Sequence, residues 1–212
     1  MSIWVRTGGF RRGSSENKKK NDKKNNRDTA VVFEYTLLAV VVAAVAVSFY
    51  YTAVTGISPI PSSSTSRRKM LECLPKDLEG RILELGAGWG TLAFPLAYQF
   101  PECEVLALEL SPVPWFFMYL RSRLFRRRNL RIRRMNFLRY PFEGAKAVVC
   151  YLHEEALATT RLKMENELEP GTLIISNTFI VPGWTPETVH RLDDSFCPNV
   201  YIYRVPEKAA VS

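Results

Sequence analysis

RILELGAGWG, at residues 81–90, is the stretch that decides the fold we expect for this chain. It begins as a short apolar run, which is typical of a buried strand, and it ends in three alternate glycines, Gly86, Gly88 and Gly90. A helix-like segment follows at residues 91–100. Glycines between a strand and a helix let the backbone approach a ligand closely, and the helix directs unpaired N–H groups towards it. The sequence therefore predicts a ligand-binding β-turn-α unit.

Further strands and helices alternate along the rest of the chain. Strand-like runs are predicted at residues 104–110, 130–135, 145–152 and 172–177, and helices at residues 113–128 and 154–168. Because strands that alternate with helices form parallel sheets, we expect a Rossmann-like α/β fold with helices on both faces of the sheet.

An acidic residue stands where such a fold binds a ribose. Glu109 ends the second predicted strand, about 20 residues beyond the glycines, where a carboxylate accepts hydrogen bonds from both ribose hydroxyls. The alternative is a solvated strand end. NAD and S-adenosylmethionine both satisfy this spacing, so spacing alone does not choose between them.

The Gly-x-Gly-x-Gly form, preceded by Glu84, resembles the class I (seven-β-strand) methyltransferases, which use S-adenosylmethionine. The resemblance implies a cofactor site in which the glycine loop holds the methionine portion, the second strand end holds the ribose, and the loop after the third strand flanks the adenine. In this chain those roles fall to Glu84, Gly86, Ala87, Gly88 and Gly90, then to Glu109, and then to Asn136 and Phe137. Many relatives have Asp at the position of Asn136, although an Asn carbonyl also accepts a hydrogen bond.

A narrower resemblance covers residues 81–205. The runs ELSP at 109–112, CYL at 150–152 and PGWTP at 182–186 are similar to those of the small membrane-anchored protein-lysine methyltransferases. That family includes mitochondrial enzymes acting on the adenine nucleotide carrier and the ATP synthase c-subunit, and bacterial relatives. The resemblance implies a lysine of a membrane protein as the acceptor.

Three residues are candidates for the acceptor side of the site. Tyr151 and His153 follow the fourth strand, at the edge where open α/β sheets bind their ligands. We expect Tyr151 to line the acceptor channel or to pack as a strand-end aromatic, and His153 to relay a proton or to be a solvated helix start. Trp184 either walls the channel through cation–π contact or anchors the core.

The N-terminal part of the chain differs in composition from the rest. Residues 1–29 are rich in Lys, Arg and Asn and predict a disordered basic tail. We expect a transmembrane helix at residues 30–57, because residues 35–57 carry no charge, then a Pro- and Ser-rich linker at 58–69 and the methyltransferase domain at 70–212. This organisation predicts a single-pass membrane protein whose domain lies on the side that contains S-adenosylmethionine, the cytosol or a mitochondrial matrix.

A second basic zone lies inside the domain, where residues 121–134 hold eight arginines and no acid. We expect it to meet anionic lipid headgroups or to be a solvated face, and we do not expect nucleic acid, because no aromatic residues alternate with the arginines. The four cysteines are far apart and predict no metal site.

Three functions remain open from the sequence. The first is methylation of a lysine in a membrane protein. The second is methylation of a lipid-soluble small molecule, and the third is a noncatalytic basic binding module on a methyltransferase fold.

Overall fold

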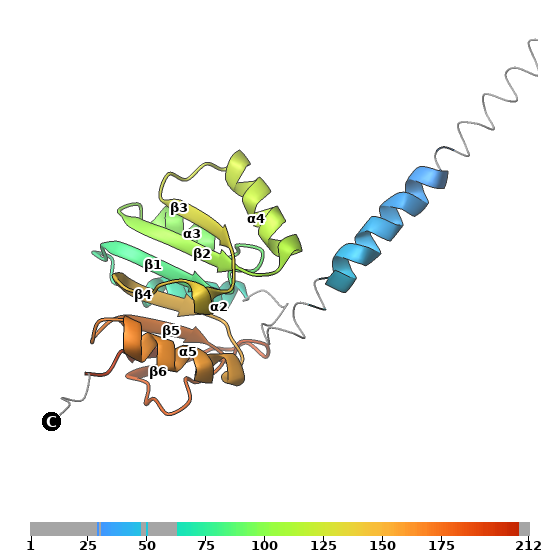
Figure 1. The fold of residues 1–212 in the computed structure, drawn as a ribbon. Coiled ribbons are helices and arrows are strands. Elements are labelled where there is room, and N and C mark those ends of the chain that lie inside the picture. Colours follow the sequence, from blue (N-terminus) through green and yellow to red (C-terminus); the bar gives the residue numbers. More distant parts are fainter. Residues whose placement is uncertain (1–28, 30, 48–49, 51–62, 208–212) are drawn as a thin grey trace, which may run out of the picture. The chain divides into compact units, whose positions relative to one another are not determined.

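The computed structural model describes residues 29, 31–47, 50 and 63–207 (Figure 1). The chain divides into two compact units, Met1–Val45 and Ala46–Ser212. Most of the predicted basic tail, and the first part of the predicted linker, lie outside the described residues.

Residues 31–47 form one continuous helix. These 17 residues span about 25 Å, whereas the hydrocarbon core of a bilayer is roughly 30 Å thick. The predicted span at residues 35–57 extends past residue 47, and residues 48, 49 and 51–57 lie outside the described residues. Within the described part of the chain, no helix has both the length and the apolar character that crossing a membrane requires. The prediction of a transmembrane helix is therefore wrong.

The second unit is built on a single sheet in the order β3-β2-β1-β4-β5-β7-β6 (Figure 1). The strands are β1 (Gly80–Leu85), β2 (Cys103–Glu109), β3 (Leu130–Arg134), β4 (Ala145–Cys150), β5 (Leu173–Asn177), β6 (Thr188–Arg191) and β7 (Asn199–Arg204). The first five strands are parallel, whereas β7 pairs antiparallel with both β5 and β6. The five parallel strands and their limits agree with the predicted ones to within two residues.

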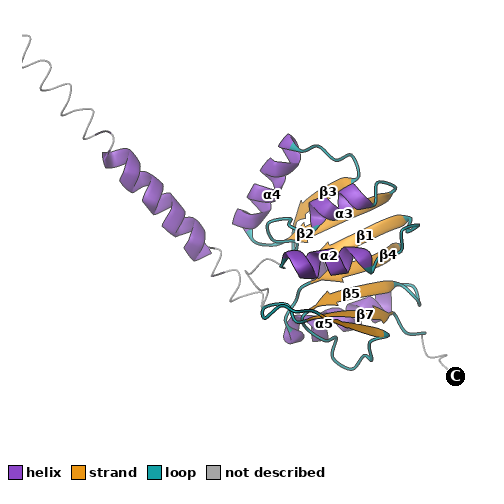
Figure 2. Ribbon diagram, turned by 180° about the vertical axis from the view of Figure 1, so that it is seen from behind, coloured by secondary structure: helices purple, strands orange, loops and turns teal. Residues whose placement is uncertain are grey.

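Helices cover both faces of the sheet, as expected (Figure 2). They are α2 (Ser64–Glu72), α3 (Ala93–Gln99), α4 (Pro112–Leu124) and α5 (Glu154–Glu167), with a short 3-10 helix, η1, at Phe137–Arg139. Side chains of α2 and α3 pack on one face with Ile82, Val105 and Val149, and α5 packs on the other face with Leu83 and Val148. Successive residues of a strand thus contribute to opposite cores, which explains why the central strands are apolar throughout.

One helix begins inside the stretch predicted as a linker. Ser63 caps α2, because its side chain accepts a hydrogen bond from the backbone N–H of Ser66 at 3.0 Å. Ser66 and Met70 are buried against the sheet. This segment is therefore part of the folded domain.

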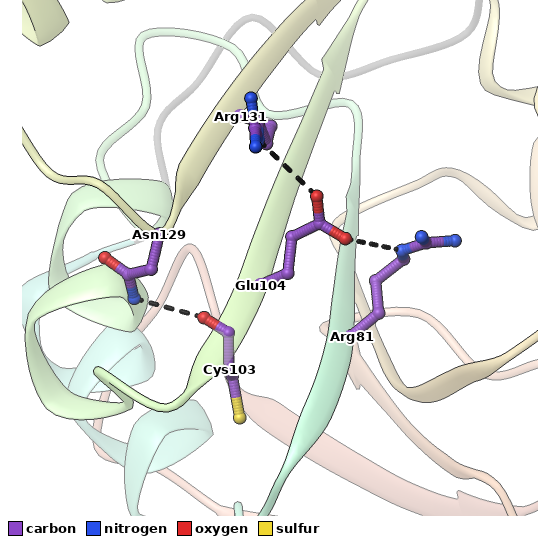
Figure 3. A network of polar contacts seen from close by, with 5 residues as sticks. All are labelled: Arg81, Cys103, Glu104, Asn129 and Arg131. Atoms are coloured by element: carbon purple, nitrogen blue, oxygen red, sulfur yellow. Dashed lines mark hydrogen bonds and ion pairs between the residues drawn. The ribbon is translucent and has the colours of Figure 1, made fainter.

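Polar contacts join the first three strands near their amino ends (Figure 3). The carboxylate of Glu104 lies between the guanidinium groups of Arg81 at 3.0 Å and Arg131 at 3.5 Å. The amide of Asn129 donates to the carbonyl of Cys103 at 3.1 Å. The ion pairs are partly exposed, so each contributes little to stability.

The strand order reverses between β1 and β4. In open α/β sheets, ligands bind at the carboxyl ends of the strands beside such a reversal. The residues that follow β1, β2, β4 and β5 meet at this edge, and the candidate site is found there.

Candidate active site

The glycine turn after β1 has a backbone conformation that residues with a side chain rarely adopt. Gly86, Gly88 and Gly90 have φ values of 71°, 55° and 72°, in the left-handed region. A Cβ atom on Gly90 would lie 2.8 Å from the side chain of Met118, so this glycine is needed for packing against α4. A Cβ atom on Gly88 would meet nothing within 4 Å. Open space therefore borders the turn at Gly88.

Glu109 points towards this turn from the end of β2. Its carboxylate accepts hydrogen bonds from the backbone N–H of Gly88 at 2.7 Å and from that of Ser111 at 2.6 Å. The residue is only 3% exposed. Burial raises the pKa of the carboxyl group, and the bonds from Ser111 and Gly88 oppose that rise. The predicted juxtaposition of turn and carboxylate is present in the structure.

Glu84 places a second carboxyl group beneath the turn. Among the described residues, its Oε2 atom is buried and has no hydrogen-bond partner. Burial raises the pKa of Glu84 well above its usual value, and the nearby charge of Glu109 raises it further. A buried polar atom without a partner is costly, so this oxygen is a ready acceptor for a cationic ligand group.

S-adenosylmethionine fits these residues. It carries an ammonium group, a sulfonium and a ribose with two hydroxyls, and the turn offers two carboxyl groups, with open space beside Gly88. Each carboxylate oxygen of Glu109 accepts more than one hydrogen bond, so its bonds to the backbone do not exclude the ribose. Gly86, Gly88 and Gly90 would hold the methionine portion together with Ala87, which is also in the turn.

The predicted adenine-flanking residues lie beside Glu109 but have structural partners. The side-chain oxygen of Asn136 accepts a hydrogen bond from Leu138 N–H at 2.9 Å, which caps η1. Phe137 is 7% exposed and packs in the core on the α5 side of the sheet. The backbone N–H of Met135 donates to the carbonyl of Glu109. Their contact with adenine stays a prediction.

An aromatic side chain of α4 borders the turn and was not among the predicted site residues. The rings of Trp89 and Phe117 meet edge to face at 5.2 Å, so α4 covers the glycine turn. Trp115 stacks on Tyr119 at 5.5 Å, and its Nε1 is buried without a partner in the described part of the chain. The signal that could have found them is the aromatic run directly after the second strand.

The acceptor-side candidates separate into two places. Tyr151 and His153, both half-buried, contact Phe179, with ring-centroid distances of 6.0 Å and 4.8 Å. Trp184 instead packs against Tyr203. Phe179 follows β5 at the same edge of the sheet and was missed, although its position two residues after a predicted strand could have indicated it.

Trp184 is held in place by a helix. Its indole N–H donates to the Glu165 carboxylate of α5 at 2.8 Å, and Glu165 also pairs with Arg161 at 3.6 Å. These contacts favour the interpretation of Trp184 as an anchor of the loop after β5. A role in the acceptor channel stays a prediction.

The arginine-rich zone is largely exposed. Two of its arginines lie over aromatic rings, Arg121 over Phe94 at 4.2 Å and Arg127 over Tyr98 at 4.8 Å. Phe116 and Phe125 on the same part of the chain are also exposed, at 54% and 64%. The expected contact with anionic lipid headgroups stays a prediction.

Comparisons with known proteins agree with this geometry. The family model described as the ANTKMT methyltransferase domain matches residues 84–188. A protein-lysine N-methyltransferase of Saccharolobus islandicus (strain REY15A) is 25% identical over 158 residues, which cover 70% of this chain and 93% of the relative.

Solved structures share the fold. An RNA methyltransferase from Salinibacter ruber, in complex with S-adenosyl-L-homocysteine, has a TM-score of 0.62 at 19% identity, over 72% of this chain and 98% of the other. A putative methyltransferase from Escherichia coli has a TM-score of 0.56 at 15% identity, over 69% of this chain and 88% of the other. At these identities the likeness concerns the fold alone. The match to the family model, supported by the protein-lysine N-methyltransferase relative and the shared fold, identifies the chain as a class I S-adenosylmethionine-dependent methyltransferase of the ANTKMT type.

Proposed function

We propose that this protein transfers a methyl group from S-adenosylmethionine to the side-chain nitrogen of a lysine in a protein. The observation that carries the proposal is the arrangement at one edge of the sheet. The glycine turn and Glu109 lie after β1 and β2, and an aromatic group formed by Tyr151, His153 and Phe179 lies after β4 and β5. The relative from Saccharolobus islandicus, named as a protein-lysine N-methyltransferase, supports lysine as the acceptor.

The chain's own residues align the acceptor and remove its proton. S-adenosylmethionine supplies an electrophilic methyl group on a sulfonium centre. A lysine has a pKa near 10.4 in water, so the amine must lose its proton before it attacks. The half-buried rings of Tyr151 and Phe179 lower that pKa by excluding water, and His153 accepts the proton. Glu109 holds S-adenosylmethionine in one orientation, so the methyl group and the amine need little further alignment before they react.

The acceptor protein, in this proposal, is a membrane protein, and the reaction occurs in a compartment that contains S-adenosylmethionine, the cytosol or a mitochondrial matrix. The resemblance of residues 81–205 to enzymes that act on membrane carriers supports this choice. It requires no membrane segment in the chain itself.

The experiment is methyl transfer from radiolabelled S-adenosylmethionine by the purified full chain. Membrane and soluble cell fractions serve as acceptors, and the label is followed into proteins, extractable lipids and RNA. Hydrolysis of the labelled proteins then identifies the modified amino acid. Glu109→Ala is the inactive variant. Glu104→Ala is the matched control, since it removes a carboxylate from the same strand at a partly exposed position.

We expect the label in methylated lysine of membrane proteins, with Glu104→Ala as active as the natural chain. Label in extractable lipid alone would replace the proposal with methylation of a lipid-soluble small molecule. Failure of the full chain to bind S-adenosylmethionine would favour a noncatalytic binding module.

A further inference from the structure

Phe179 is the shared member of the aromatic group at the carboxyl ends of β4 and β5. Its ring stacks on Tyr151 with an angle of 24° between the ring planes, and it meets His153 at 56°. All three side chains are half-buried, so part of each remains accessible. Two rings from one strand end and one from the next thus form a continuous aromatic surface, which we call the acceptor wall.

The backbone before Phe179 adopts an unfavourable conformation. Thr178 has a φ of 67°, although it is β-branched, and it is the only described residue other than glycine with a positive φ. The N–H of Phe179 donates to the carbonyl of Asn177 at 2.7 Å, which closes a three-residue γ-turn of the rare, strained form. Such conformations persist only where the surrounding structure imposes them.

Several hydrogen bonds impose this turn. The N–H of Thr178 donates to the carbonyl of Asn199 at 2.8 Å, and the Ser176 hydroxyl donates to the carbonyl of Phe179 at 2.7 Å. The side-chain oxygen of Asn177, which is fully buried, accepts from the Ser66 hydroxyl of α2 at 2.6 Å. Elements far apart in the sequence therefore hold Phe179 against Tyr151 and His153.

We propose that the acceptor wall binds the cationic head of a partly methylated lysine, and that Phe179 determines this preference. The inference rests on the proposed lysine methyltransferase function. An aromatic face attracts a cation, and a methylated ammonium is less hydrated than an unmethylated one, so it enters an aromatic surface at a smaller desolvation cost. A product of the first transfer is then retained for a second.

Each round of methyl transfer forms one bond and breaks one bond. The lone pair of the neutral lysine nitrogen forms a bond to the methyl carbon, and the carbon–sulfur bond breaks with its electron pair remaining on sulfur. The nitrogen gains the positive charge, and S-adenosylhomocysteine is the other product. Before the next round, His153 takes a proton from the nitrogen and passes it to water.

The test is a binding measurement on the full chain saturated with S-adenosylhomocysteine. Two probes, N-acetyl-lysine methylamide and its dimethylated form, are titrated while amide chemical shifts are followed by NMR. We expect the dimethylated probe to bind about 3- to 10-fold more tightly, from the strength of a partly desolvated cation–π contact. Phe179→Ala and Phe179→Leu should remove this preference, and Phe179→Tyr should retain it.

Two controls separate a binding effect from unfolding. Phe125→Ala removes an exposed phenylalanine at the end of α4, on the opposite edge of the sheet, and should leave both affinities unchanged. Phe179→Leu keeps apolar volume, so its thermal unfolding should remain close to that of the natural chain. Equal affinity of the natural chain for both probes, or an unchanged preference in Phe179→Leu, would overturn the proposed preference of the acceptor wall for methylated lysine. If lysine is still labelled in the transfer experiment, the proposed function stands without it.

Discussion

Two glycines of the turn after β1 should respond differently to the same added methyl group. Both have positive φ, so either Gly→Ala change costs about 1–2 kcal/mol of folding free energy. In Gly90→Ala the new Cβ would also lie 2.8 Å from Met118 and 3.1 Å from Phe94, and overpacking a core of this kind costs about 1–3 kcal/mol more. We therefore expect Gly90→Ala to lose about 2–5 kcal/mol of stability.

Gly88→Ala should instead impair donor binding. Its Cβ meets no atom within 4 Å, so the fold loses only the conformational cost, about 1–2 kcal/mol. The methyl group would occupy the open space beside the turn, and we expect S-adenosylhomocysteine to bind at least about tenfold more weakly, a loss of about 1.4 kcal/mol.

The assay combines urea unfolding with calorimetric titration of S-adenosylhomocysteine on the natural chain and both variants. Met118→Ala should cost less stability in the Gly90→Ala background than in the natural chain, because it removes the atoms that the new Cβ would meet. Equal destabilisation by the two glycine changes, or natural affinity in Gly88→Ala, would refute the assignment of this space to the donor.

Three further outcomes follow from the buried polar groups. The pKa of Glu84 is raised in the folded state, so above pH 4.5 the folded chain keeps the Glu84 proton while the unfolded chain releases it. The free energy of unfolding therefore falls as pH rises. Glu84→Gln should flatten the curve of unfolding free energy against pH. Ser66→Ala removes the buried hydroxyl that donates to the Asn177 side-chain oxygen, and it should lower the free energy of unfolding in urea by about 1–3 kcal/mol. Ser122→Ala, which removes an exposed hydrogen bond, should lower it little. Glu109→Gln should weaken S-adenosylhomocysteine binding by about 10- to 100-fold in calorimetry, because charged hydrogen bonds contribute about 1.5–3 kcal/mol each; unchanged affinity would contradict its role.

The parallel strands could be predicted because burial on both faces makes them apolar without interruption. β5 is buried at all five positions, and the last four residues of β1 are buried as well. β6 and β7 lack this signal, since β6 is exposed at three of its four positions. Residues 64–69 of α2 fall within the predicted linker because this Ser- and Arg-rich sequence has little apolar character. The burial of α2 depends on partners far along the chain, such as Asn177.

The cofactor side and the acceptor side of the site also differ in how far the sequence predicts them. The donor side depends on local signals, namely glycines at a strand end and a carboxylate at the next strand end, and both were predicted. The position of Phe179 depends on the strained conformation of Thr178. That conformation is imposed by two hydrogen bonds, one that Thr178 N–H donates to the Asn199 carbonyl and one that the Ser176 hydroxyl donates to the Phe179 carbonyl. A sequence pattern does not encode such long-range bonds. The predicted transmembrane helix rested on the apolar run alone, and the described helix is shorter than that run.

The most direct measurement of the donor site is a crystal structure of the full chain with S-adenosylhomocysteine. We predict ribose hydroxyls within hydrogen-bond distance of the Glu109 carboxylate and the methionine portion beside Gly88, with the amino group near Glu84. A ligand bound at another edge of the sheet, or a Glu109 carboxylate without contact to the ribose, would contradict this assignment.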